Sequence, residues 1–250
     1  MPTNYRKQMD EIIENIRTER QEPGQVPGRR PRLLMHVCCA PCSSSCLVQV
    51  RDDFDISVFF YNPNITEQDE YEKRLQEEKR LVLELNETQQ GCIQQSCIEQ
   101  SCIEQSSLQK GGQNEIQIIE GDYEPNLFLT AAKGYEKDPE GGERCKLCFE
   151  LRLRETARVA AEQGFDFFTT SLTLSPLKNA ALLNEIGEKA GEAAGVKFLP
   201  SDFKKKDGYL LSLKLSKEHD LYRQDYCGCI YSKAERQRQA NKDQEQDPEQ

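Results

Sequence analysis

The sequence predicts an α/β fold, a mostly parallel sheet with helices on both faces. Short runs rich in β-branched and aromatic residues alternate with longer segments of helical periodicity. Strands separated by helices usually pair in parallel and are covered on both faces. The chain of 250 residues is also long enough to bury a full core without disulfide or metal staples. Ligands in such folds usually bind beyond the carboxyl ends of the strands.

Five strands and four intervening helices are expected, in the order of a Rossmann-like or HUP-like domain. The strands are segments 33–37, 56–61, 116–119, 165–170 and 196–199. The helices are segments 43–50, 66–86, 145–163 and 180–194, and Thr66 is a candidate N-cap for the second. This core, residues 32–231, is the expected catalytic domain.

Three segments fall outside the alternation. Residues 1–31 form an N-terminal extension, in which a helix at 5–20 precedes a Pro/Gly-rich link at 22–28. Residues 232–250 form a polar tail, which predicts frayed helix or disorder. Residues 90–114 contain a five-residue repeat beginning at Cys92, Cys97 and Cys102, a period that matches neither a helical face nor a strand. We interpret it as a low-complexity insertion, and an extra metal or thiol site is the alternative.

Charge and hydropathy limit the class of protein. Lys and Arg number 33 against 43 Asp and Glu, so the net charge of −10 excludes a histone-like nucleic-acid binder but leaves room for a local basic patch. The mean hydropathy is −0.77. No apolar run approaches the roughly 18 residues of a membrane span, and the N-terminus lacks the apolar stretch of a signal peptide. These features predict a cytoplasmic protein with no membrane partner.

Eleven cysteines are the outlying feature of the composition. In a reducing compartment they favour metal ligation or redox chemistry over structural disulfides. Outside the repeat, seven of them form three groups: Cys38, Cys39 and Cys42; Cys145 and Cys148; Cys227 and Cys229. A four-cysteine zinc site, a dithiol–disulfide enzyme and an iron–sulfur cluster with a separate redox pair all remain open, and the last fits the count best. Three other residues are expected to be structural: Cys46, His36 and His219.

Five separated motifs resemble those of the QueH family of epoxyqueuosine reductases. They are His-Val-Cys-Cys-Ala-Pro-Cys-Ser at 36–43, Tyr-Asn-Pro-Asn-Ile at 61–65, Glu-Arg-Cys-Lys-Leu-Cys-Phe at 143–149, Thr-Thr-Ser-Leu-Thr-Leu-Ser-Pro-Leu-Lys-Asn at 169–179 and Tyr-Arg-Gln-Asp-Tyr-Cys-Gly-Cys at 222–229. The resemblance covers roughly residues 31–232. It implies the last step of queuosine synthesis, a two-electron deoxygenation of epoxyqueuosine to queuosine at the tRNA wobble position.

The resemblance also implies cofactors and residue roles. A [4Fe–4S] cluster would be bound by Cys38, Cys39, Cys145 and Cys148. Cys227 and Cys229 would form a redox-active pair, and ligation of the neighbouring metal by two free thiols is the alternative. An additional mononuclear metal, iron in the simplest case, would lie beside the cluster, and we assign Cys42 to it. Electrons would come from an external donor.

The implied substrate is a base in a tRNA anticodon loop, which can be splayed out and stacked on aromatic or Arg side chains. Candidate substrate-binding residues from the motif segments are Arg144, Lys178, Asn179, Tyr222, Arg223 and Tyr226. The lysines at 204–206 could meet phosphates, and a solvated charge run is the alternative. Candidate proton donors are Tyr61, Tyr226 and Asp225, and each could equally be structural.

Two other functions remain as alternatives. One is a zinc-stabilised binding module without redox chemistry. The other is a tRNA sulfurtransferase or ATP-pyrophosphatase-like enzyme on a similar sheet. The second is disfavoured because the loop after the first strand, Cys-Cys-Ala-Pro-Cys-Ser, has no glycine to let a phosphate approach the backbone.

Overall fold

The computed structural model describes residues 3–20, 29–98 and 115–246, and within them the predicted α/β fold is confirmed. Five parallel strands form one sheet in the order β3-β2-β1-β4-β5. The strands are β1 Arg32–Val37, β2 Asp55–Phe60, β3 Gln117–Glu120, β4 Phe167–Thr170 and β5 Lys197–Phe198. The order reverses at β1, so the crevice between the ends of β1 and β4 is the position where such sheets bind ligands.

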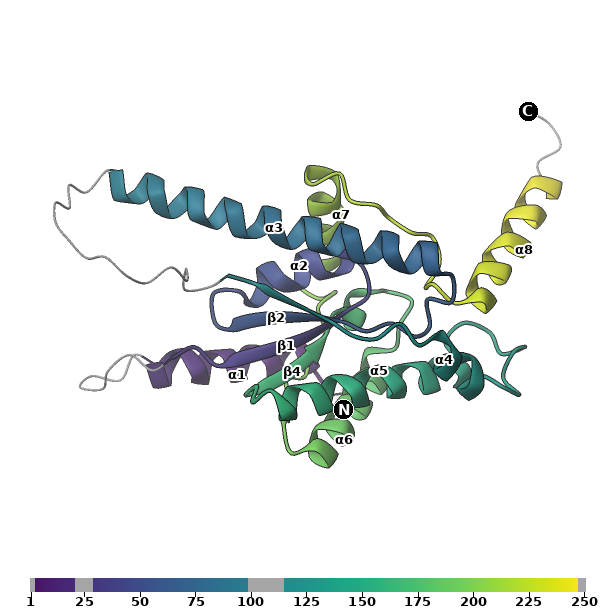
Figure 1. Ribbon diagram of the computed structural model, residues 1–250, viewed down its shortest axis with the longest axis horizontal. Helices are drawn as coiled ribbons and strands as arrows, with labels where there is room; N and C mark the ends of the chain where they lie inside the picture. Colours follow the sequence, from purple (N-terminus) through teal and green to yellow (C-terminus); the bar gives the residue numbers. More distant parts are fainter. Residues whose placement is uncertain (1–2, 21–28, 99–114, 247–250) are drawn as a thin grey trace.

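Helices cover both faces of this sheet (Figure 1). Those described are α1 Tyr5–Arg20, α2 Ala40–Val50, α3 Gln68–Ile98, α4 Pro125–Ala131, α5 Glu143–Glu162, α6 Ala180–Ala194, α7 Gly208–Glu218 and α8 Ile230–Gln246, with a 3₁₀ turn at Ser171–Leu174. Side chains of α1, α2 and α3 share one hydrophobic core with the sheet, whereas α5 and α6 pack on the other face. None of the described helices is long and apolar enough to cross a membrane.

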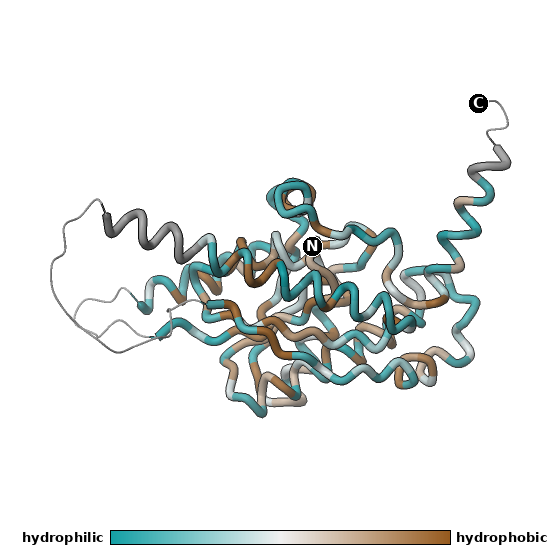
Figure 2. The backbone as a smooth tube through the Cα atoms, turned by 45° about the horizontal axis from the view of Figure 1, so that its top comes forward, coloured by the Kyte–Doolittle hydropathy of each residue, from teal (hydrophilic) through white to brown (hydrophobic). Residues whose placement is uncertain are grey.

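The period of two along β1 sends side chains alternately to the two faces. Leu33, Met35 and Val37 are fully buried on the face of α2 and α3, and Leu34 is fully buried on the opposite face. Both faces of a central parallel strand are apolar for this reason. Figure 2 shows the hydrophobic stretches gathered along the central strands, with α8 hydrophilic and projecting from the body.

The N-terminal helix is an integral part of the core and is not a free appendage. Met9 is fully buried and Ile13 nearly so, both within the hydrophobic cluster of α2 and α3. Arg17 donates to the Asp53 carboxylate at 2.7 Å and fixes the end of the helix. The predicted link at 22–28 lies outside the described residues.

Several predicted boundaries differ from the structure, among them the start of α2, which is Ala40 and not residue 43. Helix α3 begins at Gln68, and the Oγ1 of Thr66 is buried without a hydrogen-bond partner, so Thr66 is not its N-cap. The same helix continues past residue 86 to Ile98, and the first part of the repeat is therefore helical. The rest of the repeat, including Cys102, lies outside the described residues. The tail is helical from Ile230, and α4 was not predicted.

Candidate metal centre

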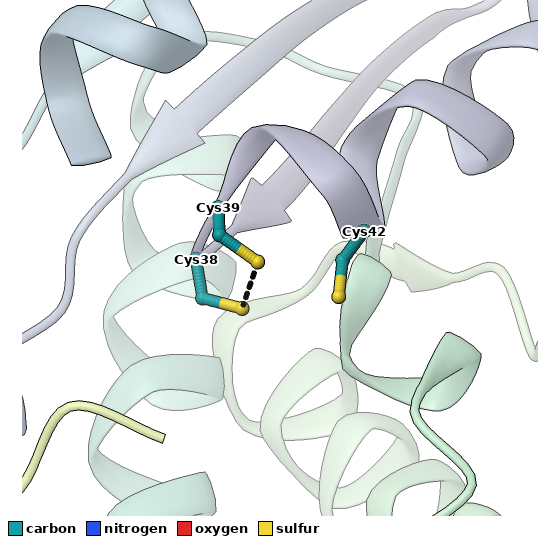
Figure 3. A group of neighbouring side chains, drawn as sticks. All are labelled: Cys38, Cys39 and Cys42. Carbon is teal, nitrogen blue, oxygen red and sulfur yellow. Dashed lines mark hydrogen bonds between the residues drawn. The ribbon is translucent and has the colours of Figure 1, made fainter. Parts of the chain in front are cut away.

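The first cysteine group lies where β1 ends and α2 begins. Cys39 is the N-cap residue of α2, and the amides of Cys42 and Ser43 donate to its carbonyl at 3.1 Å. Pro41 is tolerated in this first turn because its missing N–H would have no partner within the helix. The turn brings the sulfurs of Cys38, Cys39 and Cys42 within 4.8 Å of one another. Figure 3 shows the three side chains grouped where β1 meets α2.

The three thiols of this group differ in acidity. Hydrogen bonds with Cys39 and Cys42 hold the pKa of Cys38 well below its usual value, and the cations of Lys178 and Arg152 act in the same direction. The same hydrogen bond raises the pKa of Cys39 to about 12, and bonds to its two neighbours raise that of Cys42. The site therefore stabilises a thiolate at Cys38, which is the form that binds metals.

The second group, Cys145 and Cys148, lies in the first two turns of α5. The amide of Gly141 donates to Cys145 Sγ at 3.2 Å. Burial raises the pKa of both thiols, that of Cys148 to about 11. Their spacing places both sulfurs on one side of the helix, facing the same cavity.

Arg144, between Gly141 and Cys145, supports the preceding loop. Its guanidinium is 2% exposed and donates to the carbonyl oxygens of Tyr135 at 3.0 Å, Glu136 at 3.2 Å and Asp138 at 2.5 Å. It also lies 4.8 Å from the ring centroid of Tyr231. Its Nη1 makes all three bonds to the loop, its Nε is buried without a partner, and the residue lines the same cavity as Cys145 and Cys148. Arg144 therefore supports the loop, and its role in substrate binding stays a prediction.

The third group, Cys227 and Cys229, consists of two free thiols whose sulfurs are 3.6 Å apart. The hydrogen bond between the two sulfurs holds the pKa of Cys227 well below its usual value and raises that of Cys229. Ser232 contacts both: its Oγ lies 3.0 Å from Cys227 Sγ, and its amide donates to Cys229 Sγ at 3.4 Å. Gly228 has φ +113°, and a Cβ there would meet Ile65 at 2.7 Å, so glycine is required.

The Asn-Pro-Asn turn after β2 joins the first and third groups. Asn62 donates to the carbonyl of Val37, the last residue of β1, at 2.9 Å. Asn64 donates to the carbonyl of Cys227 at 3.2 Å, and Arg74 from α3 donates to the same carbonyl at 3.3 Å. The motif at 61–65 therefore fixes the distance between two cysteine groups, a role that its sequence does not reveal.

Two adjoining cavities bring the three groups together. The larger, about 170 Å³, is lined by Cys38, Cys42 and Cys227. The smaller, about 90 Å³, is lined by both cysteines of the second group and both of the third. The two cavities share the side chains of Glu140, Arg152, Leu177, Lys178 and Cys227.

The other candidate residues are distributed unevenly around the cavities. Lys178 lines both, whereas Arg223, Asp225 and Tyr226 line the larger one. Asn179 lines the smaller cavity and caps α6 by accepting from the Leu182 amide at 3.2 Å. Tyr222 lines neither, and its hydroxyl donates to Glu70 at 3.1 Å.

Burial raises the pKa of Tyr226 to about 12. Tyr61 lines neither cavity and stacks on Phe59 at 5.8 Å between ring centroids. In the basic run, Lys204 pairs with Asp202 at 2.7 Å and Lys206 with Asp10 at 2.8 Å. At least two of the lysines at 204–206 are therefore engaged in ion pairs within the protein.

The three residues expected to be structural, His36, Cys46 and His219, have structural surroundings. His36 is fully buried between Thr170 Oγ1 and the carbonyl of Tyr61, each at 3.1 Å, and burial lowers its pKa to about 3. Cys46 is fully buried in the core. His219 ends α7, with Nδ1 2.8 Å from Glu84.

Two residues at the shared wall were missed by the sequence analysis. Glu140 belongs to none of the motifs. Arg152 lies in the middle of α5, where an arginine ordinarily faces solvent. Arg152 is 3% exposed. Its position four residues after Cys148, on the same helical face, is the signal that could have found it.

The chain is similar to known proteins over most of its length. Residues 33–235 match the family described as "Epoxyqueuosine reductase QueH". The protein of that name from Streptococcus pyogenes serotype M1 is 42% identical over 203 residues, 81% of this chain and 71% of the relative. The one from Staphylococcus epidermidis is 36% identical over 231 residues, 92% of this chain and 86% of the relative.

A distant likeness exists among solved structures. The U34-tRNA thiolase NcsA from Methanococcus maripaludis, solved with its [4Fe-4S] cluster, is 12% identical with a TM-score of 0.44, covering 97% of this chain and 75% of that chain. A likeness of this degree supports no argument about chemistry. The family match spans most of the chain and its cysteine motifs, and the chain belongs to the epoxyqueuosine reductase QueH family.

Proposed function

We propose that this chain reduces epoxyqueuosine to queuosine within tRNA, at the wobble position, using an iron–sulfur cluster and a thiol pair. The reaction removes the epoxide oxygen as water and consumes two electrons and two protons. The observation that carries the proposal is the convergence of three cysteine groups on two adjoining cavities beside the end of β1. Family membership supplies the substrate.

Cys38, Cys39, Cys145 and Cys148 are the proposed ligands of a [4Fe–4S] cluster, which would supply electrons one at a time. The donor set fits the group, because soft thiolates are the ligands that iron–sulfur clusters use. The surrounding charges fit it as well. Lys178 lines both cavities, and although burial opposes its charge, Cys38, Cys42 and Cys227 raise its pKa. A thiolate-bound cluster is anionic, and cations at its wall compensate that charge.

Cys227 and Cys229 are the proposed redox pair. Their sulfurs are close enough to join after a small movement, and the hydrogen bonds that stabilise Cys227 as a thiolate favour it as the attacking sulfur. Oxidation of the two thiols to a disulfide would release two electrons and two protons, the same numbers that the reduction of the epoxide consumes. Cys42, which faces the larger cavity beside Cys38, is the proposed ligand of a second metal, iron.

The larger cavity is the proposed binding site for the modified base. Tyr226 supplies an aromatic face, while Arg223 and Lys178 supply cations. Together they can stack a splayed base and hold its phosphate. Asn179 and Tyr222 contribute indirectly, by capping α6 and by anchoring the loop to Glu70.

The proposal is tested by anaerobic incubation of the reconstituted protein with epoxyqueuosine-containing tRNA and dithionite, followed by nucleoside analysis. We expect conversion to queuosine by a brown protein containing iron and sulfide. Cys145→Ala should lose iron, sulfide and turnover. Cys46→Ser, which alters a buried cysteine away from both cavities, is the matched control and should keep them. A colourless, zinc-containing protein, or full cluster loading in Cys145→Ala, would contradict the proposed ligand set.

A further inference from the structure

Arg152 is a buried cation without a carboxylate partner. It lies on α5, is 3% exposed, and its Nε donates to the carbonyl oxygen of Cys148 at 3.2 Å. Its guanidinium lies 5.5 Å from the ring centroid of Phe149. Within residues 3–20, 29–98 and 115–246 it makes no ion pair with an acidic side chain.

The other two buried arginines show how a guanidinium is normally accommodated. Arg74 pairs with Glu70 at 2.6 Å, and Arg144 donates to three backbone carbonyl oxygens. A guanidinium keeps its charge in proteins, so removing it from water without an anionic partner is strongly unfavourable. The single carbonyl contact leaves the remaining donors of Arg152 facing the cavities that it lines, where an anion other than the protein's own carboxylates would compensate its charge.

The surroundings of Arg152 identify this anion. Arg152 lines both cavities and lies beside the thiols of all three cysteine groups. Lys178 lines the same shared wall and likewise makes no ion pair among the described residues. Glu140 is the one carboxylate on that wall, and Asp225 lines the larger cavity. Two cations thus face a set of thiols that becomes anionic when it binds metal.

We propose that Arg152 is a positioning residue that compensates the charge of the iron–sulfur cluster and raises its reduction potential. The inference rests on the proposed cluster. A cluster held by thiolates is anionic in both redox states and gains one further negative charge when it accepts an electron. A fixed cation stabilises the reduced state more than the oxidised one, so Arg152 makes the one-electron reduction easier without a proton being taken up.

The expected effect is large enough to measure. At the effective dielectric constant of a protein, about 20, one unit charge roughly 10 Å away changes an equilibrium constant by at least about tenfold. For a one-electron couple, a tenfold change corresponds to about 59 mV. Arg152→Gln should therefore lower the midpoint potential by about that amount or more.

The test is an EPR-monitored potentiometric titration of the anaerobically reconstituted full chain, with iron and sulfide content measured in parallel. Arg152→Lys should recover most of the potential, because it restores the charge. Arg158→Gln is the matched control: it removes the same charge from the same helix at an exposed position paired with Glu155 and Glu162, and should leave the midpoint unchanged.

Each outcome decides the question. A fully loaded Arg152→Gln protein with an unchanged midpoint would overturn the inference and leave the proposed function intact. If Arg152→Gln folds by circular dichroism but retains little cluster, recovery of loading in Arg152→Lys supports the charge role, and equal loss in both overturns it. A parent protein that binds no cluster refutes the proposed function, and the inference with it, before any variant is compared.

Discussion

Glu78 is a fully buried carboxyl on α3, and its titration should dominate the pH dependence of folding near neutrality. Burial raises its pKa to about 8, against the opposing effect of the Ser43 hydroxyl. Ser43 Oγ lies 2.8 Å from Glu78 Oε2 and 3.2 Å from the carbonyl oxygen of Ala40. A protonated Glu78 can donate to Ser43, which then donates to Ala40. An ionised Glu78 is left as a buried charge without a cation.

The direction in which stability changes with pH follows from the linkage between proton binding and folding. A carboxyl whose folded-state pKa is raised binds its proton more tightly when folded, so stability falls as pH rises between the unfolded and folded pKa values. With an unfolded pKa of about 4.5 and a folded pKa of about 8, the loss between pH values of about 5.5 and 8.5 is roughly 3 kcal/mol. Glu78→Gln, which cannot ionise, should escape this loss.

The assay is urea unfolding of the apo-protein with its thiols kept reduced, at both pH values, for the parent and the variant. At each pH, the free energy of unfolding of Glu78→Gln is compared with that of the parent. We expect this difference to shift by about 3 kcal/mol in favour of the variant when the pH is raised from the lower to the higher value. Glu77→Gln is the control: hydrogen bonds from Arg80 lower the pKa of Glu77, so it stays ionised throughout and its difference should not change. An equal difference at both pH values for Glu78→Gln would refute the reasoning.

Three further predictions concern the cysteine loops. Gly228→Ala should destabilise the protein by about 1–3 kcal/mol in thermal or urea unfolding, because the new Cβ meets Ile65 and φ is positive; an unchanged stability would contradict this account. Ser232→Ala should slow alkylation of Cys227 by iodoacetamide several-fold near neutral pH, measured by mass spectrometry, with Ser232→Thr restoring the rate. Arg144→Met should cost about 3 kcal/mol or more and increase proteolysis of the loop before α5, because three carbonyls lose their donor; wild-type protection would argue against this support role.

Local sequence signals predicted most of the fold. Helix α6 begins and ends as expected because both ends carry their own signals: Asn179 accepts from the amide of Leu182, and Gly195 adopts the left-handed conformation after the last turn. The strands were found because continuous apolar runs mark strands that are buried on both faces. Helix α4 was missed because its seven residues are too few to display a periodicity.

Features that depend on distant residues could not be predicted in this way. Amphipathicity of residues 5–20 was visible, but the docking of α1 depends on a groove formed by other helices. The place of Arg144 in a motif suggested a substrate contact, but it did not reveal that the guanidinium also supports the preceding loop through three carbonyls. Arg152 carried no motif at all, and its burial follows from the meeting of separate cysteine loops beside α5.

The spread of the cavity walls along the chain sets an order of events during biosynthesis. The larger cavity is lined by Cys38, near the start of the domain, and by Arg236, on the last described helix. A nascent chain that still lacks α8 cannot close this cavity, so we expect any metal held there to be loaded after α8 has been synthesised. Prematurely terminated chains would instead present the thiols of the first group to solvent and oxidants. The fold thereby predicts that metal insertion follows the synthesis of α8.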